Sequence, residues 1–221
     1  DMQHGQNDYQ SSIAMLQALS NSQSVPMVRI PWSEPGIIMR MLDLGVMGII
    51  APMINTKKDC ENFVSFCKYP PIGQRSFGPM RAQLVHGMDY FENANSNILC
   101  FAMIETKEAI ENLDEILSVP NLTGVYIGPA DMSSSYGLKP KFDVKEDPVF
   151  SNIKLIAKKA KEYDKIAGIH NGTTQYAKEM IAIGYQLVTV SSDYRAMTSF
   201  AQSVVDEMKQ LTRKTNQSDT Y

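Results

Sequence analysis

The sequence has few of the residues that mark redox, nucleic-acid-binding and membrane proteins. Only three cysteines occur in 221 residues, Cys60, Cys67 and Cys100, and none forms a CxxC pair. We therefore expect free thiols, buried or half-buried, in a reducing cytoplasm. The net charge is −3 with no basic block, which argues against a nucleic-acid partner. No apolar run reaches membrane length and no signal peptide opens the chain, so we expect a cytoplasmic protein without membrane contact.

Two further absences argue against particular folds and reaction mechanisms. No glycine-rich phosphate loop follows any expected strand, which argues against a doubly wound nucleotide-binding fold. No lysine stands at the end of a strand, since Lys57, Lys58 and Lys107 fall in the first turns of expected helices. A Schiff-base mechanism therefore lacks an obvious nucleophile.

Short apolar runs alternate with segments of helical periodicity along the chain. The clearest unit joins the apolar run in 98–107 to that in 124–131 through a segment with isoleucine and leucine at helical spacing. The six expected strands lie in 25–30, 48–53, 98–107, 124–131, 165–170 and 186–190. We expect helices between them and a final amphipathic helix near 194–211. Strict alternation of this kind predicts a parallel α/β protein.

A (β/α)₈ TIM barrel that lacks its first two strands fits the pattern best. Such barrels run to about 250 residues, and the chain opens with a polar loop, 1–8, of the kind that normally follows a strand. No linker or repeat divides the sequence. We therefore expect 1–221 to form a single, N-terminally incomplete barrel domain, with a frayed polar tail at 213–221.

Polar side chains follow the carboxyl ends of the expected strands, and these ends share one face of a parallel sheet. Glu105 and Asp131 are two such residues. Two hard oxygen ligands without a neighbouring cysteine suit Mg²⁺ or Mn²⁺. The alternative is that Glu105 only favours the start of a helix and that Asp131 only caps a turn. Other residues at strand ends are Arg29, Met53, His170 and Asp193, with His4 after a strand that would precede the chain.

Arg29 and His170 also have two interpretations each. An unpaired arginine is costly to bury, so Arg29 either pairs with a carboxylate or binds an anion. His170 either hydrogen-bonds the backbone or contributes to a site. A carboxylate pair, an arginine and one or two histidines suit the binding of an anionic oxo acid on a metal and proton transfer at the adjacent carbon.

Several motifs stand in the order and spacing of a known family. They are residues 1–5 (DMQHG), 28–29 (VR), 42–45 (LDLG), 75–79 (RSFGP), 104–106 (IET) and 128–131 (GPAD). In this combination the whole chain resembles the HpcH/HpaI aldolase/citrate lyase family. Within it the likeness is to class II 2-oxo-acid aldolases of the 4-hydroxy-2-oxoheptanedioate and 2-keto-3-deoxy sugar acid type. The resemblance implies a barrel of the phosphoenolpyruvate/pyruvate superfamily.

The resemblance implies a metal and substrate site at the strand ends. Glu105 and Asp131 would hold a divalent metal, either Mg²⁺, Mn²⁺ or Co²⁺. Pyruvate would chelate this cation, with its carboxylate on the backbone N–H groups of Ala130 and Asp131. Family members often carry glutamine where Met103 faces the substrate, so one hydrogen bond to pyruvate is absent here. His170, in the segment 168–172, would help to shape the aldehyde pocket.

The resemblance also implies the catalytic residues. His4 would be the general base, and Asp1 and Asp43 would orient it, with Asp43 acting within one subunit or across a subunit boundary. Arg29 would stabilise the enolate oxygen. Family members often carry glutamate at the position of Gln3, and an amide there removes a charge near His4.

The implied activity is the divalent-metal-dependent cleavage of a 4-hydroxy-2-oxo acid to pyruvate and an aldehyde, with the reverse condensation. One alternative is a citrate-lyase-like enzyme acting on an acyl-CoA, which would need a basic entrance that the sequence does not show. Another is a non-catalytic barrel that binds an oxo acid. A homo-oligomer, usually a hexamer in this family, is expected, with the final helix packed on a neighbouring subunit.

Overall fold

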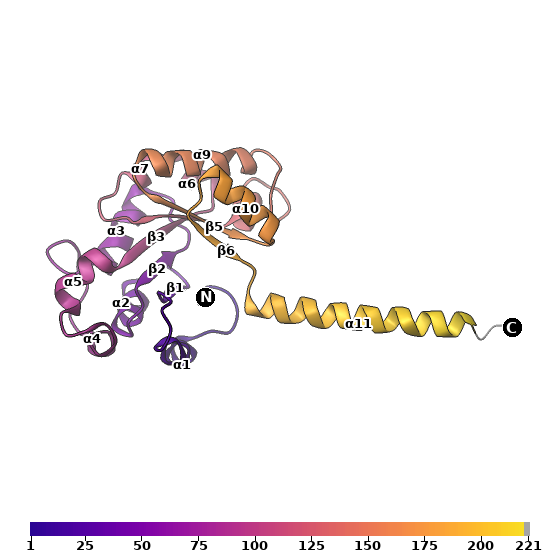
Figure 1. The fold of residues 1–221 in the computed structure, drawn as a ribbon. Helices are drawn as coiled ribbons and strands as arrows, with labels where there is room; N and C mark the ends of the chain where they lie inside the picture. Colours follow the sequence, from indigo (N-terminus) through magenta and orange to yellow (C-terminus); the bar gives the residue numbers. More distant parts are fainter. Residues whose placement is uncertain (219–221) are drawn as a thin grey trace.

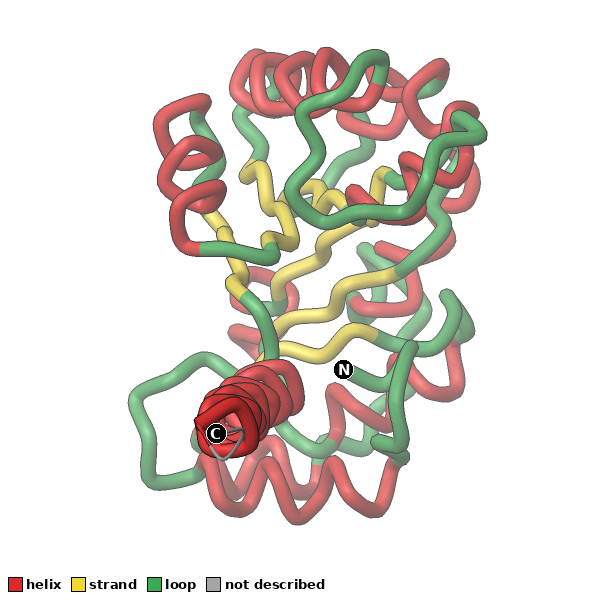
Figure 2. The backbone as a smooth tube through the Cα atoms, turned by 90° about the vertical axis from the view of Figure 1, so that its right-hand side faces the viewer, coloured by secondary structure: helices red, strands yellow, loops and turns green. Residues whose placement is uncertain are grey.

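The computed structural model describes residues 1–218, with side chains up to residue 209. Within this part of the chain six strands form a single sheet: β1 (Met27–Arg29), β2 (Gly48–Ala51), β3 (Leu99–Ile104), β4 (Gly124–Ile127), β5 (Ile166–Asn171) and β6 (Leu187–Val190). They lie in the order β1-β2-β3-β4-β5-β6, and each is parallel to the next. The sheet curls, with helices along its outer side (Figures 1 and 2). The six predicted strands and the parallel α/β class are confirmed.

At least one helix follows each strand, as the periodicity predicts. They are α1 (Tyr9–Leu19), α2 (Pro35–Asp43), α3 (Lys57–Cys67), α4 (Met80–His86), α5 (Tyr90–Asn97), α6 (Lys107–Glu111), α7 (Leu113–Leu117), α8 (Pro129–Ser135), α9 (Val149–Glu162), α10 (Thr174–Ile183) and α11 (Asp193–Ser218). The helix expected after Lys107 is divided into α6 and α7. Asn112 ends the first and begins the second, and its side-chain amide donates to the Asn55 carbonyl at 2.9 Å.

The two faces of the sheet have different surroundings. The outer face packs against the helices in one core that runs from Met2 to Tyr185. The inner face carries a smaller buried cluster of Phe101, Met103 and Tyr126. Successive side chains of a strand point to opposite faces, so a residue two positions after an inner-face residue also points to the inner face. This places Arg29, Glu105 and His170 on the inner face, at or just past the carboxyl ends of their strands.

Helix α11 projects away from the body of the protein (Figure 1). It continues to Ser218, past the predicted end near Leu211. The predicted frayed tail begins within this helix, and its last residues, 219–221, lie outside the described part of the chain. None of the described helices combines the length and the apolar character needed to cross a membrane.

The three cysteines are buried as free thiols, as predicted. Burial raises the pKa of the Cys60 thiol to about 12 and that of Cys67 well above its usual value. Neither is a nucleophile at neutral pH, because the thiolate is the reactive form.

Candidate active site

Glu105 is a buried carboxylate at the carboxyl end of β3. The residue is 1% exposed, and its Oε1 accepts a hydrogen bond from the Met53 backbone N–H at 2.7 Å. Its other oxygen, Oε2, is buried without a hydrogen-bond partner among the described residues. Burial raises the pKa of Glu105 to about 7; the Met53 hydrogen bond opposes this rise, Asp131 adds to it and Arg29 opposes it. An oxygen that is shielded from water and has no donor is ready to accept a cation.

This burial makes the stability of the metal-free protein depend on pH. The pKa of Glu105 is about 7 in the folded state, against 4.5 for an ordinary glutamate, so between these values the folded state binds the proton more tightly. We expect the contribution of Glu105 to the free energy of unfolding to fall as pH rises from about 4.5 to 7, by roughly 3 kcal/mol, and to level off above. Denaturant titrations of chelator-treated protein at several pH values measure this slope. The Glu105→Gln variant should lose it, and an unchanged slope would contradict the assignment.

Gly128 leaves the space into which the free oxygen of Glu105 points. A Cβ atom at this position would lie 2.7 Å from Glu105 Oε2 and 3.1 Å from Met103 Cε. Both distances are too short for undisturbed contact, so any side chain here would displace the carboxylate. Met103 itself is fully buried, with no exposed surface.

Gly128→Ala is therefore expected to weaken divalent-metal binding by about 10- to 100-fold, the usual effect of disturbing a group that supports a ligand. Calorimetric titration with Mn²⁺ measures it. Gly36→Ala is the matched control, since a Cβ there would meet nothing within 4 Å. Equal affinities for the two variants would show that the Glu105 carboxylate is not a ligand.

The second carboxylate, Asp131, lies in the first turn of α8. Gly128 precedes this helix and Pro129 is its first residue, and the first hydrogen bond of the helix runs from Met132 N–H to the Gly128 carbonyl at 3.0 Å. The N–H groups of Ala130 and Asp131 therefore lie outside the helical ladder and are open to a ligand. Among the described residues no group of three or more His, Cys, Asp or Glu side chains could hold a metal. Two carboxylates suffice for Mg²⁺, which keeps several waters and takes its remaining ligands from the substrate.

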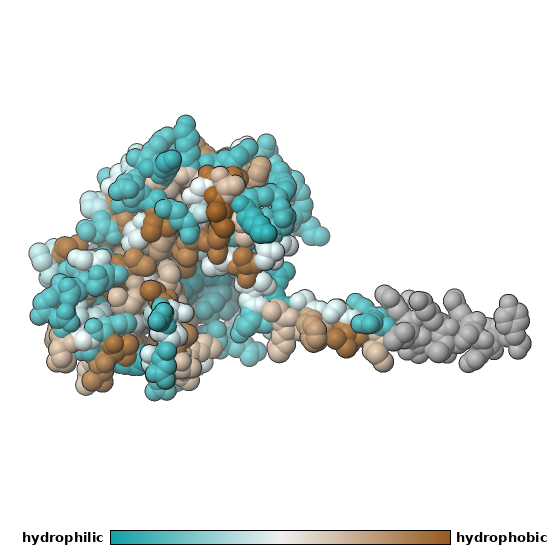
Figure 3. Space-filling model, viewed as in Figure 1, coloured by the Kyte–Doolittle hydropathy of each residue, from teal (hydrophilic) through white to brown (hydrophobic). Residues whose placement is uncertain are grey.

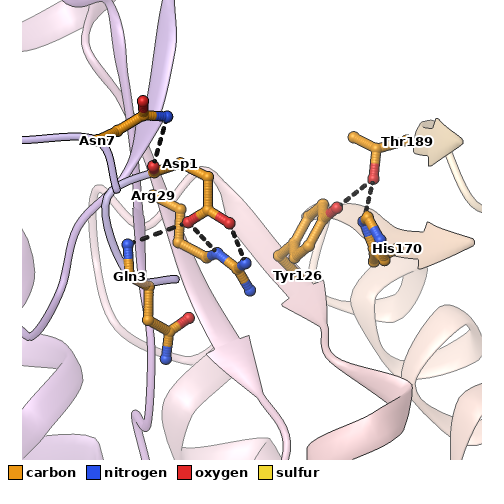
Figure 4. A network of polar contacts seen from close by, with 7 residues as sticks. All are labelled: Asp1, Gln3, Asn7, Arg29, Tyr126, His170 and Thr189. Atoms are coloured by element: carbon orange, nitrogen blue, oxygen red, sulfur yellow. Dashed lines mark hydrogen bonds and ion pairs between the residues drawn. The ribbon is translucent and has the colours of Figure 1, made fainter. Parts of the chain in front are cut away.

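Arg29 faces the same space from β1. Of the two alternatives for this residue, the structure shows the ion pair: Nε and Nη2 lie 3.0 and 2.5 Å from the two carboxylate oxygens of Asp1 (Figure 4). The Gln3 N–H donates to the same carboxylate at 3.0 Å. Asp1 uses the Nε–H and one N–H of Nη2, whereas the second N–H of Nη2 and both N–H groups of Nη1 make no hydrogen bond to Asp1. Arg29 combines a structural pair with an open donor.

The structure does not bring His4 together with Asp1 or Asp43 within one chain. His4 is exposed in the opening loop and has no hydrogen-bond partner in the described part of the chain. Asp43, at the end of α2, instead accepts from Arg75 Nη2 at 2.7 Å. Arg75 is 1% exposed and also donates to the Tyr90 hydroxyl at 3.0 Å. Sequence reasoning assigned no partner to Arg75, although the RSFGP motif singled it out.

His170 makes a side-chain hydrogen bond, which neither alternative from the sequence included. Its Nδ1 lies 3.0 Å from Thr189 Oγ1, which in turn lies 2.5 Å from the Tyr126 hydroxyl (Figure 4). Sequence reasoning missed Tyr126 and Thr189. The sequence could have indicated both residues. Side chains of a strand alternate between its two faces, and both residues fall at positions that face inward.

Carboxylates and an arginine lie at the carboxyl ends of a curled, parallel six-stranded sheet, which is where α/β enzymes carry their active sites. A family model, "HpcH/HpaI aldolase/citrate lyase", matches residues 1–198. Hydroxypyruvate/pyruvate aldolase of Rhizorhabdus wittichii is 38% identical over 211 residues, which cover 96% of this chain and 84% of that protein. 5-Keto-4-deoxy-D-glucarate aldolase of Shigella dysenteriae is 32% identical over 211 residues, or 95% and 82% of the two chains. The chain belongs to the HpcH/HpaI aldolase/citrate lyase family and is a carbon–carbon lyase with aldolase function.

Solved structures agree on the fold. An HpcH/HpaI aldolase from Desulfitobacterium hafniense superposes with a TM-score of 0.87 at 23% identity, over 95% of this chain and 82% of that one. Macrophomate synthase superposes with a TM-score of 0.86 at 21% identity, over 97% and 76%. The second name describes a different reaction from the first, so the fold alone does not fix the chemistry.

Proposed function

We propose that this protein catalyses the divalent-metal-dependent cleavage of a 4-hydroxy-2-oxo acid to pyruvate and an aldehyde, and the reverse condensation. The observation that carries the proposal is the buried, unpartnered oxygen of Glu105 beside Asp131. The same proposal assigns the fold to the phosphoenolpyruvate/pyruvate superfamily of barrels and treats 1–221 as one barrel domain. The aldolase relatives support the reaction class.

The residues at the strand ends fit a divalent cation, Mg²⁺, Mn²⁺ or Co²⁺. Glu105 and Asp131 would hold it, and it would supply electrostatic stabilisation of charge on the keto oxygen of the substrate. The N–H groups of Ala130 and Asp131 donate to the carboxylate of the oxo acid. Arg29, through its open Nη1, stabilises the enolate oxygen that forms as the carbon–carbon bond breaks. Asp1 holds the guanidinium in the orientation that this requires.

His4 is the general base of the proposed reaction. In cleavage its imidazole takes the proton from the C4 hydroxyl, the C3–C4 electron pair passes to the oxo acid as its enolate, and the aldehyde leaves. The protonated His4 then returns the proton to C3, directly or through water, which gives pyruvate and restores the base. His4 is exposed in a loop next to β1, so it can reach a substrate held at the strand ends. In condensation the same imidazole acts on C3 of pyruvate.

We also propose a homo-oligomer, with a hexamer as the expected form. Helix α11 leaves the body with exposed apolar side chains along it: Tyr194, Met197, Phe200, Val204 and Val205, each 45% exposed or more (Figure 3). An apolar stripe of this kind normally marks a contact with another chain. A neighbouring subunit packed on α11 would cover it, and an assembly could also bring Asp43 close to the His4 of another copy.

The proposed oligomer can be tested by placing a charged residue in the apolar stripe of α11 and measuring the solution mass. We expect Phe200→Glu to lower the solution mass measured by light scattering, because an unpaired charge is costly in a buried contact. Ser199→Glu, on the neighbouring position of the same helix, is the control and should keep the mass of the parent. A monomeric parent protein would contradict the proposal.

The proposed reaction is tested by chelation and metal replacement. Chelator-treated protein is mixed with Mg²⁺, Mn²⁺ or Co²⁺, and pyruvate release is followed from a panel of 4-hydroxy-2-oxo acids. Metal-restored release is the expected result. Release from an acyl-CoA substrate instead would favour the citrate-lyase-like alternative, and tight metal binding without release from either class would favour a binding-only barrel.

A further inference from the structure

Three side chains form a hydrogen-bonded chain across the inner face of the sheet, from β4 to β6. The Tyr126 hydroxyl lies 2.5 Å from Thr189 Oγ1, and Thr189 Oγ1 lies 3.0 Å from His170 Nδ1 (Figure 4). Strand β5 lies between β4 and β6, so the Tyr126 side chain must cross it. It does so over Gly168, its register partner, where a Cβ would lie 2.7 Å from Tyr126 Cδ2. The missing side chain of Gly168 is what lets the phenol reach Thr189.

One arrangement of hydrogens satisfies every donor in this three-residue network. Each hydroxyl has one hydrogen, and the arrangement that uses both inside this network has Tyr126 donating to Thr189 and Thr189 donating to His170 Nδ1. If Nδ1–H donated to Thr189 instead, while Tyr126 still donated to it, the Thr189 hydrogen would have no acceptor among the described residues. In the reverse direction the phenol hydrogen would have no acceptor among the described residues, in a side chain that is 4% exposed. A buried donor without an acceptor is unfavourable. The imidazole hydrogen therefore sits on Nε2.

The surroundings keep this imidazole neutral and fixed. Burial, followed by the charges of Arg29 and Arg195, lowers the pKa of His170. The ring of Phe142 meets the imidazole edge to face, with centroids 5.1 Å apart. The loop that carries Phe142 is held by Asp143, which accepts from the Gly172 N–H at 2.7 Å and from Thr173 Oγ1 at 2.6 Å.

His170 also has a defined position relative to the carboxylate site. Met103 pairs with Tyr126 and Tyr126 pairs with Gly168. Two residues further along each strand, the same register puts Glu105, Gly128 and His170 in one row. Gly128 contributes no side chain, so no side chain of β4 stands between His170 and Glu105, whose Oε2 lies over Gly128. Two strand spacings, about 10 Å, separate the ends of this row, which suits a substrate of five or six carbons lying across Gly128.

We propose that Tyr126 and Thr189 are positioning residues that hold His170 with its Nε2–H toward this space, where it donates to an oxygen on the aldehyde part of the substrate. The inference rests on the proposed function and extends it to specificity. The enzyme should prefer an aldehyde that carries an oxygen on the carbon next to its carbonyl over an alkyl aldehyde of equal size.

The test compares glycolaldehyde with propanal as acceptors for pyruvate, since the two differ by a hydroxyl in place of a methyl group. We expect the parent enzyme to favour glycolaldehyde in kcat/KM, and His170→Phe, Tyr126→Phe and Thr189→Val to lower that ratio by about three- to tenfold. Thr189→Ser keeps the hydroxyl and should keep the ratio. An unchanged ratio in Thr189→Val and Tyr126→Phe would overturn the proposal.

Two further readouts separate this proposal from the proposed function. Exchange of the C3 protons of pyruvate in D₂O needs no aldehyde, so its absence from the parent enzyme with every metal would refute the proposed function alone. Nitrogen NMR of the resting protein reports the tautomer of His170. We expect Nε2–H with an accepting Nδ1 in the parent protein and a shift of the tautomer in Thr189→Val. The opposite tautomer in the parent would overturn the positioning role.

Discussion

Replacing Glu105 by glutamine is expected to lower metal-dependent lyase activity by about 10³-fold or more. The variant keeps the shape of the side chain and can still accept from the Met53 N–H, but it removes the charge that would bind the cation. Metal ions contribute several kcal/mol to stabilising an enolate-like transition state, and each 1.36 kcal/mol is about tenfold in rate. Assays over a range of Mn²⁺ concentrations measure the loss, which excess metal should not restore.

Unfolding cannot account for this loss of activity, because Glu105→Gln is expected to maintain or raise the stability of the metal-free protein. A neutral side chain at position 105 no longer has to be ionised in a buried place, so above pH 7 the metal-free variant should be no less stable than its parent. Glu108→Gln is the matched control, since Glu108 is an exposed glutamate in the next helix. Full activity in Glu105→Gln would refute the proposed metal site.

The fold was predictable because the strands and helices are encoded locally. The central strands β3 and β4 are short apolar runs buried on both faces, and α3 begins with a Thr56–Asp59 capping box that the sequence displays directly. The division between α6 and α7 was not predictable in this way. It depends on the hydrogen bond from Asn112 to the Asn55 carbonyl, and residues so distant along the chain meet only after folding.

The residues of the candidate site were also predictable only in part. The positions of Glu105 and Asp131 at the strand ends were predictable, because a carboxylate at the end of an apolar run is visible in the sequence. The pairing of Asp43 with Arg75 was not found, since it joins a helix end to an irregular loop. The alternation of side chains along β4 would have placed Tyr126 on the inner face. Its contact with Thr189 on β6 could not be predicted, because it passes over Gly168 and requires the register of β4 and β5.

Replacing His4 by alanine is expected to lower the rate of cleavage by roughly 10²- to 10⁴-fold, the usual contribution of a general base. Binding of Mn²⁺ should not change, because His4 makes no hydrogen bond or ion pair with Glu105 or Asp131 in the described chain. Gln6→Ala, in the same exposed loop, is the control and should keep full activity.

The two roles assigned near the amino terminus can be separated by added imidazole. A small base that diffuses into the site can replace the missing side chain of His4→Ala, so its cleavage rate should rise with the concentration of imidazole. Asp1→Asn should lose activity without such rescue, because Asp1 acts through the ion pair that orients Arg29. If His4→Ala cleaved at the rate of Gln6→Ala, another group would have to be the base. Rescue of Asp1→Asn by imidazole would instead place Asp1 in proton transfer, together with His4.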